Sequence, residues 1–511
     1  MRHVTRRELI SGTMGGTLAL ARKGNVAASA DQSGNLLQLA WNDSGVPNPF
    51  QVSPAGPRGP ILVSLIYDTL TWKDESGIIP WLASEWSASE DGLTYSFQLV
   101  SGATWHDGEP LTADDVAFSF DYYAQHPFVW MSSAVVDSVT ANGDTVGFSL
   151  NLPYAPFLED IAGIVPIIPR HVWESVDDPI AYDGADSTVG SGPYSLAEYN
   201  ATEGAYRLTA NAGYWRGTPA VAELRFLNVP PEAIIPATQQ GDIDVSPSSD
   251  ATVIDILADD ERLEVHESAP LSIVRLAVNT SRAPLDRKEV RQAIMYAIDR
   301  ELLAETITLG PAVVGSAGVI PPETPWFNPD LTQYDFDPDR ARELLGGEQI
   351  SIDLIADASA RDPDIFAPML EAVGITLNVQ RVDSATRIQL ARDGEFDLAF
   401  LTHIGVGGDP DYLRRWYSGE ETNAFAQGSI FTNEEYTRLA EEQAESLNAE
   451  EREEIVFEMQ AILAEELPTI VLYHRRFYWI HDPMLFTPME TWGGLMNGIP
   501  FPHNKLALIA T

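Results

Sequence analysis

The fold is decided by the stretch from Gly92 to Tyr123, which reads GLTYSFQLVSGATWHDGEPLTADDVAFSFDYY. After an Asp-Gly turn, apolar and polar side chains alternate from Tyr95 to Leu99, as on a half-buried strand. Thr112 then begins a helix whose third residue, Asp115, reaches back to it. The apolar residues on one face of this helix are Val116, Phe120 and Tyr123. Strand, turn and amphipathic helix make a structural unit, so chemistry is expected elsewhere.

A second pattern, between residues 350 and 401, predicts an α/β fold. Apolar strands are expected at Ile350–Ala356, Ile375–Val379 and Phe396–Leu401. Helices are expected between them, the first ended by Gly374 and the second by Gly394. A βαβαβ order of this kind implies parallel strands joined by right-handed crossovers.

Further helices are expected from Ile61 to Thr71 and after Asp286, where Glu289 completes a capping pattern. The second helix should continue through Leu302 on one apolar face. A hairpin is expected around Asn142-Gly143, and Ser384 is expected to cap the helix that Gly394 ends.

The composition is strongly acidic. The 511 residues include 31 Lys and Arg against 75 Asp and Glu, a formal net charge of -44. Nucleic acid is therefore excluded as a partner, because it would be repelled. A carboxylate-coated globular chain is tolerated when salt screens the self-repulsion, so we infer a halophilic, haloarchaeal source. The absence of cysteine excludes disulfides, thiolate metal sites and a lipid anchor on Cys.

The first thirty residues are expected to be a targeting segment. Arg6 and Arg7 lie in a twin-arginine export pattern, and residues 28–30 read Ala-Ser-Ala, a cleavage site. No apolar run approaches the roughly 20 residues that span a bilayer. We therefore expect a soluble protein at the outer face of the cell membrane, with no transmembrane segment.

Several separated blocks, in order, resemble the family 5 extracellular solute-binding proteins. These are the dipeptide, oligopeptide and nickel-binding receptors of ABC importers. The blocks are Ile79–Trp86, Gly92–Tyr123, Val189–Tyr194, Val290–Arg300 and Gly394–Ala399. The resemblance therefore covers nearly the whole chain after the targeting segment.

The resemblance implies a periplasmic-binding-protein-like type II fold, bilobed with an extra domain, whose two lobes close on a central cleft. Its domains would be residues 31–66 with 186–270 and 482–511 as domain I, 67–185 as domain II, and 271–481 as domain III. The implied partners are a peptide-like or other small solute and the permease subunits of an ABC transporter. We expect a monomer with no cofactor.

Ligands of open α/β sheets bind beyond the carboxyl ends of parallel strands. Two predicted strands end in this way, before residues 402–410 and 356–362. Arg361 is suited to a carboxylate, while Thr402 and His403 can donate or accept hydrogen bonds. Tryptophans can stack on a sugar or an apolar chain. The candidate ligand-binding residues are Trp41, Asn42, Arg361, Thr402, His403, Val406, Asp409 and Trp416.

One position departs from the peptide-binding members of the family. Their ligand loop carries an Asp that pairs with the α-ammonium of the peptide, and Val406 stands at that position here. Because a buried cation needs a countercharge, free peptides are expected to bind poorly unless Asp409 substitutes. Sugars, blocked peptides or anionic solutes would then be favoured.

Two other interpretations remain open within the sequence. An oligosaccharide or a nickel chelate would suit the same family, although His403 has no second histidine at ligand spacing. A secreted glycoside hydrolase would use two carboxylates, which this acidic chain supplies in excess without indicating any pair. Since no common nucleophile, zinc or nucleotide motif occurs, we expect no enzyme activity.

Overall fold

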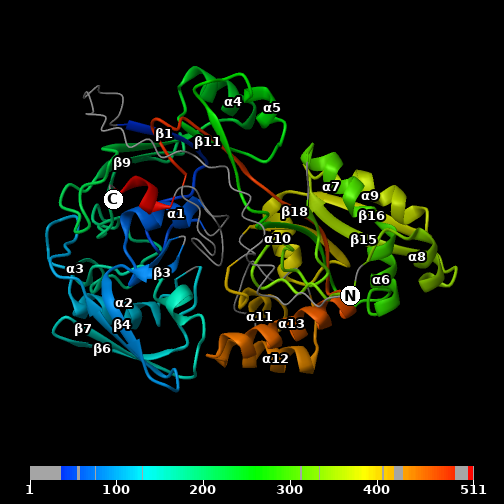
Figure 1. Cartoon of the computed structure of the whole chain (residues 1–511), viewed down its shortest axis with the longest axis horizontal. Coiled ribbons are helices and arrows are strands. Elements are labelled where there is room, and N and C mark those ends of the chain that lie inside the picture. Colours follow the sequence, from blue (N-terminus) through cyan, green and yellow to red (C-terminus); the bar gives the residue numbers. More distant parts are fainter. Residues whose placement is uncertain are drawn as a thin grey trace, which may run out of the picture. The chain divides into compact units, whose positions relative to one another are not determined.

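The computed structural model describes residues 36–53, 58–74, 76–128, 130–310, 313–332, 334–404, 408–418, 430–488 and 504–509 (Figure 1). Two large sheets and a smaller one carry these residues, together with a two-stranded ribbon. The strands and helices follow the α/β class that the sequence predicts.

The first sheet has seven strands. In spatial order they are β12 (Glu264–Glu267), β19 (Tyr478–His481), β11 (Val245–Ser248), β1 (Leu36–Trp41), β10 (Glu223–Asn228), β9 (Ala205–Ala210) and β8 (Tyr194–Asn200). The helices α1 (Arg58–Ile66), α4 (Pro231–Gln240) and α5 (Val253–Leu257) come from the same stretches of chain, as does the 3-10 turn η4 (Lys505–Leu508). Strand β1 runs parallel to β10 and β11, and β19 pairs antiparallel with both β11 and β12. Strand β19 thus hydrogen-bonds within the first sheet, whereas the sequence analysis assigned residues 271–481 to domain III.

Residues 67–185, here called the insert, hold the smaller sheet. Its strands in order are β4 (Ala83–Ala88), β5 (Thr94–Leu99), β7 (Thr145–Leu150) and β6 (Val136–Asn142). The ribbon is β2 (Thr71–Asp74) with β3 (Gly77–Pro80), and the helical pieces are α2 (Ala113–Tyr123), η3 (Phe157–Ile161) and α3 (Arg170–Trp173). The predicted strand, helix and hairpin are confirmed here as β5, α2 and β6–β7. The carboxylate of Asp115 accepts a hydrogen bond from the Thr112 amide at 2.8 Å, as the capping pattern requires.

The second sheet has six strands. Their order is β14 (Val313–Val314), β18 (Thr469–Arg475), β13 (Ser272–Val278), β17 (Leu398–Ile404), β15 (Ile350–Asp357) and β16 (Ile375–Val382). Its helices are α6 (Lys288–Ala297), α7 (Arg300–Thr308), α8 (Pro338–Leu345), α9 (Asp362–Glu371), α10 (Ser384–Arg392), α11 (Tyr412–Tyr417), α12 (Glu434–Glu445) and α13 (Ala449–Glu466). Strand β15 is parallel to both β16 and β17, which confirms the βαβαβ prediction.

Three predicted helix boundaries are wrong for identifiable reasons. The first helix ends at Ile66, because the Ile66 carbonyl accepts from the Gly192 amide and the Thr71 amide donates to the Ala162 carbonyl, in place of helical bonds. The helix expected to continue through Leu302 stops at Ala297, and Asp299 caps a new helix on which Leu302 is 50% exposed. The cap of α10 is Asp383, whose carboxylate accepts from the Thr386 amide, and not Ser384.

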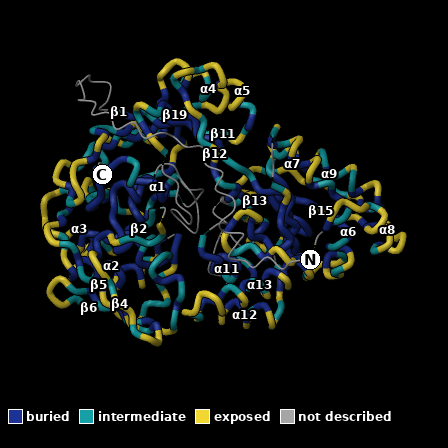
Figure 2. Tube along the Cα trace, in the orientation of Figure 1, coloured by how far each residue is buried: buried dark blue, intermediate teal, exposed yellow. Residues whose placement is uncertain are grey.

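The apolar core is divided. One cluster joins the first sheet to the insert, whereas separate clusters pack on the second sheet. Figure 2 shows buried segments running through both regions beneath exposed helical faces. The chain passes between the two sheets where β12 leads to β13 and where β18 leads to β19. In the described residues, no helix combines the length and apolarity needed to cross a membrane.

Candidate functional site

A cavity of 330 Å³ lies where β15 and β17 end. Arg361 lines it from the turn after β15 and Thr402 from β17, while Arg475 reaches it from the end of β18. The two strand ends that the sequence singled out therefore meet at one hollow, as expected for parallel neighbours.

The two acidic side chains that line the cavity are already engaged. The Asp357 carboxylate accepts from the Ser384 hydroxyl at 2.7 Å and lies 2.9 Å from Nε of Arg387. Buried Asp362 accepts from the Tyr473 hydroxyl at 2.7 Å. Neither carboxylate is left as a free negative charge facing a ligand.

Two guanidinium groups face the same space. Arg361 is exposed, and no group in the described part of the chain pairs with its guanidinium. Arg475 donates from Nη2 to the Tyr473 hydroxyl at 3.2 Å, while burial raises the pKa of that phenol. Because Arg binds carboxylates in a forked, charge-assisted geometry, the cavity suits an anionic group.

The contacts of His403 do not support a role in binding a ligand or a metal. Its ring centroid lies 4.8 Å from that of Trp416, and its Nε2 lies 3.3 Å from Nη2 of Arg275. A guanidinium can only donate, so Nε2 must accept and the ring must be neutral. Burial, with help from nearby arginines, holds the pKa of His403 well below its usual range. The ring therefore packs on Trp416 and Arg275, and a metal at Nε2 would have to displace the arginine.

Arg275 itself was not anticipated. Its side chain has 0% exposure, donates to the Thr469 hydroxyl at 3.2 Å and lies 5.1 Å from the Trp416 ring centroid. Burial lowers its pKa. In the sequence, Arg275 could have been identified as the single charged residue in the otherwise apolar strand β13. Arg475, a charged residue at the end of the mostly apolar strand β18, could have been identified in the same way.

The candidates from the first sheet lie apart from the cavity lining. Trp41 is 3% exposed and packs edge-on against Phe226, with ring centroids 4.8 Å apart. Asn42 is exposed beside it. Trp41 is therefore a core residue of the first sheet here, with no open face for stacking on a sugar.

The remaining candidates concern the loop after β17. Val406 lies outside the described residues. Both carboxylate oxygens of Asp409 accept from Arg452 at 2.6 Å, and both side chains are buried. Asp409 is thus committed to an internal ion pair, which disfavours it as the replacement partner for a peptide ammonium.

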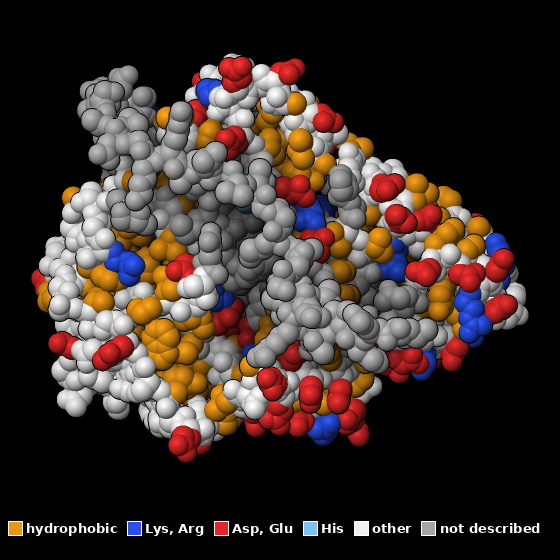
Figure 3. Space-filling view, in the orientation of Figure 1, with side chains coloured by type: hydrophobic (Ala, Val, Ile, Leu, Met, Phe, Trp, Pro, Cys, Tyr) orange, Lys and Arg blue, Asp and Glu red, His pale blue; other side chains and the backbone are white. Residues whose placement is uncertain are grey.

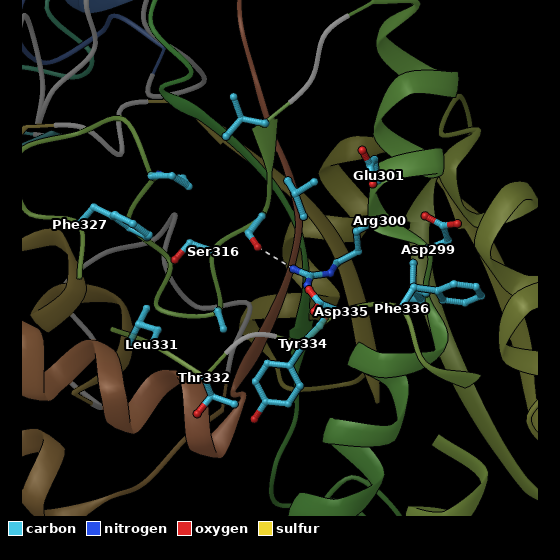
Figure 4. A pocket seen from close by; sticks show the side chains of 16 residues that line it. Asp299, Arg300, Glu301, Ser316, Phe327, Leu331, Thr332, Tyr334, Asp335 and Phe336 are labelled. Carbon is cyan, nitrogen blue, oxygen red and sulfur yellow. Dashed lines mark hydrogen bonds between the residues drawn. The ribbon is translucent and has the colours of Figure 1, made fainter. Parts of the chain in front are cut away.

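A second cavity, of 490 Å³, lies beside α7 and β14. Arg300 dominates its wall and donates to the carbonyls of Gly315 and Tyr334, each at 2.6 Å (Figure 4). Burial lowers the pKa of Arg300 to about 10. With its donors directed at backbone carbonyls, this arginine fixes two loops, and the acidic Asp299, Glu301 and Asp335 around it make the cavity a poor anion site.

Comparison with known families decides the identity. A model of the bacterial extracellular solute-binding proteins, family 5 Middle, matches residues 77–425, more than half of the chain. The chain belongs to this family. Family 5 proteins are solute-binding receptors that serve ABC importers, so this protein is a receptor and the glycoside hydrolase interpretation is set aside.

Individual relatives agree. The dipeptide-binding protein of Escherichia coli K12 is 28% identical over 434 residues, which are 78% of this chain and 81% of the relative. The nickel-binding periplasmic protein of the same organism is 26% identical and covers 68% and 71%. The structure of NikA from Brucella suis in complex with Fe(III)-EDTA matches with a TM-score of 0.79 at 22% identity, covering 92% of this chain and 98% of that one. The family 5 fold is therefore shared across nearly the entire chain.

Proposed function

We propose that this receptor captures a small solute carrying a carboxylate, which Arg361 and Arg475 hold at the ends of β15 and β18. The observation that carries the proposal is the pair of cavity-facing guanidinium groups without a carboxylate partner in the described residues. An anion placed there would gain charge-assisted hydrogen bonds for which the described residues offer these guanidinium groups no carboxylate.

A peptide-like solute with a blocked or absent ammonium fits this site best. The similarity to a dipeptide-binding protein supports peptide chemistry. However, Val406 replaces the expected carboxylate by sequence, and Asp409 is paired with Arg452. An N-acylated peptide keeps the carboxylate for the arginines and needs no second countercharge.

A metal chelate is the second candidate. One relative is a nickel-binding protein, and NikA from Brucella suis was solved with Fe(III)-EDTA, an anionic polycarboxylate chelate. Among the described residues no group of three His, Asp or Glu side chains is placed to hold a metal ion. A metal would therefore enter already chelated, and the arginines would bind the carboxylates of the chelator.

The proposal extends to export of the protein and to its partners at the cell surface. The precursor is exported by the twin-arginine pathway, cut after Ala30, and works as a monomer outside the cell with the permease subunits of an ABC importer. The first and second sheets belong to the two lobes that close on the solute, the insert is the extra domain, and domain III ends near Arg475. The -44 charge fits a halophilic source.

The experiment is a thermal-shift screen in concentrated KCl, followed by calorimetry. Dipeptides, N-acetyl dipeptides, oligosaccharides and nickel chelates are compared, because a ligand of the folded state raises its stability. Arg361→Ala and Arg475→Ala should each weaken binding of an N-acetyl dipeptide by about 10- to 100-fold, about 1.5 to 3 kcal/mol per charge-assisted bond. The matched control is Arg340→Ala on α8, an exposed arginine that pairs with Glu343.

Val406→Asp tests the specificity argument separately. It should improve the binding of a free dipeptide, because it restores a countercharge for the ammonium. Binding of a free dipeptide by the unaltered protein at about micromolar Kd, about −8 kcal/mol, with loss of that binding on N-acetylation, would show that an ammonium site exists and would overturn the proposed preference.

A further inference from the structure

Away from the cavity, the insert meets the helices of the second sheet through buried polar groups. The Tyr154 hydroxyl lies 3.0 Å from Oδ2 of Asp411 and 3.3 Å from Oδ2 of Asp160. Nη2 of Arg415 lies 3.6 Å from the same Asp160 oxygen. The side chains of Asp160 and Asp411 have 0% exposure and that of Arg415 has 9%. These four residues, Tyr154, Asp160, Asp411 and Arg415, are called the latch.

The latch joins two regions whose apolar clusters are mostly separate, although Ala444 of α12 belongs to the cluster of the first sheet and insert. Tyr154 belongs to the apolar cluster of the first sheet and insert, whereas Tyr412 and Leu413, beside Asp411, belong to a cluster of the second sheet. One backbone bond accompanies it, from the Ala155 amide to the Ala444 carbonyl at 2.7 Å. Charged groups are readily rehydrated when an interface opens, while apolar area is not. A contact of this composition can break and re-form.

Residues from the helices of the second sheet hold the Asp411 carboxylate in place independently of the insert. Arg414 donates to both of its carboxylate oxygens, at 2.7 and 2.9 Å, and Gln443 donates to Oδ1 at 2.8 Å. The insert therefore meets a preorganised acceptor. Asp411 lies nine positions after Thr402, the β17 residue that lines the cavity.

We propose that Tyr154 and Asp160 are positioning residues for solute capture: they latch the insert onto α11 in the solute-holding conformation and release it when the two regions part. This inference rests on the proposed function in one respect: separation of the insert from the second-sheet helices is taken to let a solute enter. The latch residues do not touch the cavity, so their effect is on the conformational equilibrium and reaches affinity through the population of the competent form.

The equilibrium between the latched and open forms should also depend on pH, through protonation of Asp160. Burial, partly offset by Arg415, raises the pKa of Asp160 to about 7. The other charged groups that face it are Asp409, Asp411 and Lys73, with the Tyr154 hydroxyl between them. In an open form Asp160 is hydrated and returns to about 3.9. Latching therefore takes up a proton, so the latched form is favoured at acidic pH and loses this advantage as the pH rises through about 7.

The test uses the absence of cysteine. Spin labels at Asp137→Cys on β6 and Glu434→Cys on α12, both exposed positions, report the distance across the latch in the full chain with no solute present. In the Tyr154→Phe variant, the distribution of label-to-label distances should gain a longer component. In the parent protein, this component should be a minor population at most. The matched control is Tyr182→Phe, which removes an insert hydroxyl that donates to the Asp186 carboxylate at 2.6 Å.

Measuring the distance between the labels at two pH values tests the contribution of Asp160. In the labelled parent the longer distance should grow from about pH 6 to about pH 8.5, across the raised pKa. Asp160→Asn, which is uncharged throughout, should show the same distribution at both pH values. Distances in Tyr154→Phe that match those of the Tyr182→Phe control, or a parent distribution unaffected by pH, would overturn the latch.

Affinity for N-acetyl-Ala-Ala, the probe used, separates this inference from the proposed function. Tyr154→Phe should weaken its binding several-fold at about neutral pH, with Arg361 unchanged. If the labels part as expected and the probe binds no variant, the latch stands and the proposed solute class fails. Equal affinity in Tyr154→Phe and the Tyr182→Phe control would show that the latch has no part in capture.

Discussion

The ammonium nitrogen of Lys505 lies 2.8 Å from Oδ1 of Asp68, and neither side chain has any exposed surface. The same nitrogen lies 4.1 Å from the ring centroid of Trp72 and 4.6 Å from that of Trp81. Asp68 also accepts from Nε1 of Trp81 at 2.7 Å. A residue near the end of the described chain is thus tied to the segment that follows α1.

Lys505→Met should therefore destabilise the fold. It leaves the Asp68 carboxylate buried without its countercharge, a loss of about 3 to 5 kcal/mol in the free energy of unfolding. Urea unfolding in concentrated KCl measures it. The double variant with Asp68→Asn should recover part of the loss, while the control Lys288→Met, which breaks an exposed pair with Glu465, should cost about 0 to 1 kcal/mol. Equal effects of Lys505→Met and Lys288→Met would contradict the prediction.

Acid should weaken the fold through buried histidines. Burial lowers the pKa of His474 to about 3 and holds that of His403 well below its usual value. In the unfolded chain both titrate near 6.5, so the stability they allow is complete above about pH 6.5 and is lost as the pH falls below it. Each contributes about 1.4 kcal/mol per pH unit. Asp160, with its raised pKa, acts in the opposite direction over the same range.

The measurement for this prediction is the free energy of unfolding between about pH 6.5 and about pH 5. It should fall, since among the described residues four histidines have a lowered pKa (His106, His403, His474 and His481), against two carboxylates, Asp160 and Asp244, with a raised one. His403→Gln, which keeps a hydrogen-bond acceptor for Arg275, should reduce the slope by about one proton. A slope that is the same in this variant would mean that His403 already titrates in the folded state.

Salt should stabilise the protein. The Debye length falls from about 10 Å at 0.1 M to about 3 Å at 1 M, which weakens repulsion among the surface carboxylates. Figure 3 shows acidic side chains gathered over α12 and α13, where Glu441, Glu442 and Glu445 lie. The Tm should rise with KCl, and the rise should be smaller when these three residues are replaced by Gln. A Tm that does not change with KCl would rule out the halophilic interpretation.

Export should depend on the paired arginines. Replacing both Arg6 and Arg7 with Lys keeps the charge but removes the motif, so the precursor should remain inside the cell. Immunoblots of cell and medium fractions measure this. A variant in which Arg2 alone is replaced with Lys is the control, and secretion of the double variant at the control level would exclude the twin-arginine route.

Local signals predicted the secondary structure well where they acted without competition. Gly374 and Gly394 have φ of +100° and +69°, a conformation that glycine tolerates, and each follows its helix as expected. The failures lie where distant groups override a local pattern. The predicted helix from Ile61 to Thr71 ends early because the Ile66 carbonyl and the Thr71 amide bond to the distant Gly192 and Ala162.

The site was predicted only in part for the same reason. Residues on β15 and β17 could be placed together, because neighbouring parallel strands share an edge. Arg475 and Arg275 come from antiparallel strands whose partners are far away in sequence. The contact between Tyr154 and Asp411 spans 257 residues, and no local spacing indicates it.

The position of β19 has a consequence for biosynthesis. This strand lies between β11 and β12 and supplies hydrogen bonds to both, yet its residues follow β12 by more than two hundred positions. While the ribosome is still translating the second sheet, β12 has no neighbour and the edge of β11 is open. The first sheet therefore closes only after Tyr478–His481 has emerged from the ribosome, which leaves an unpaired β-edge for a chaperone to cover until then.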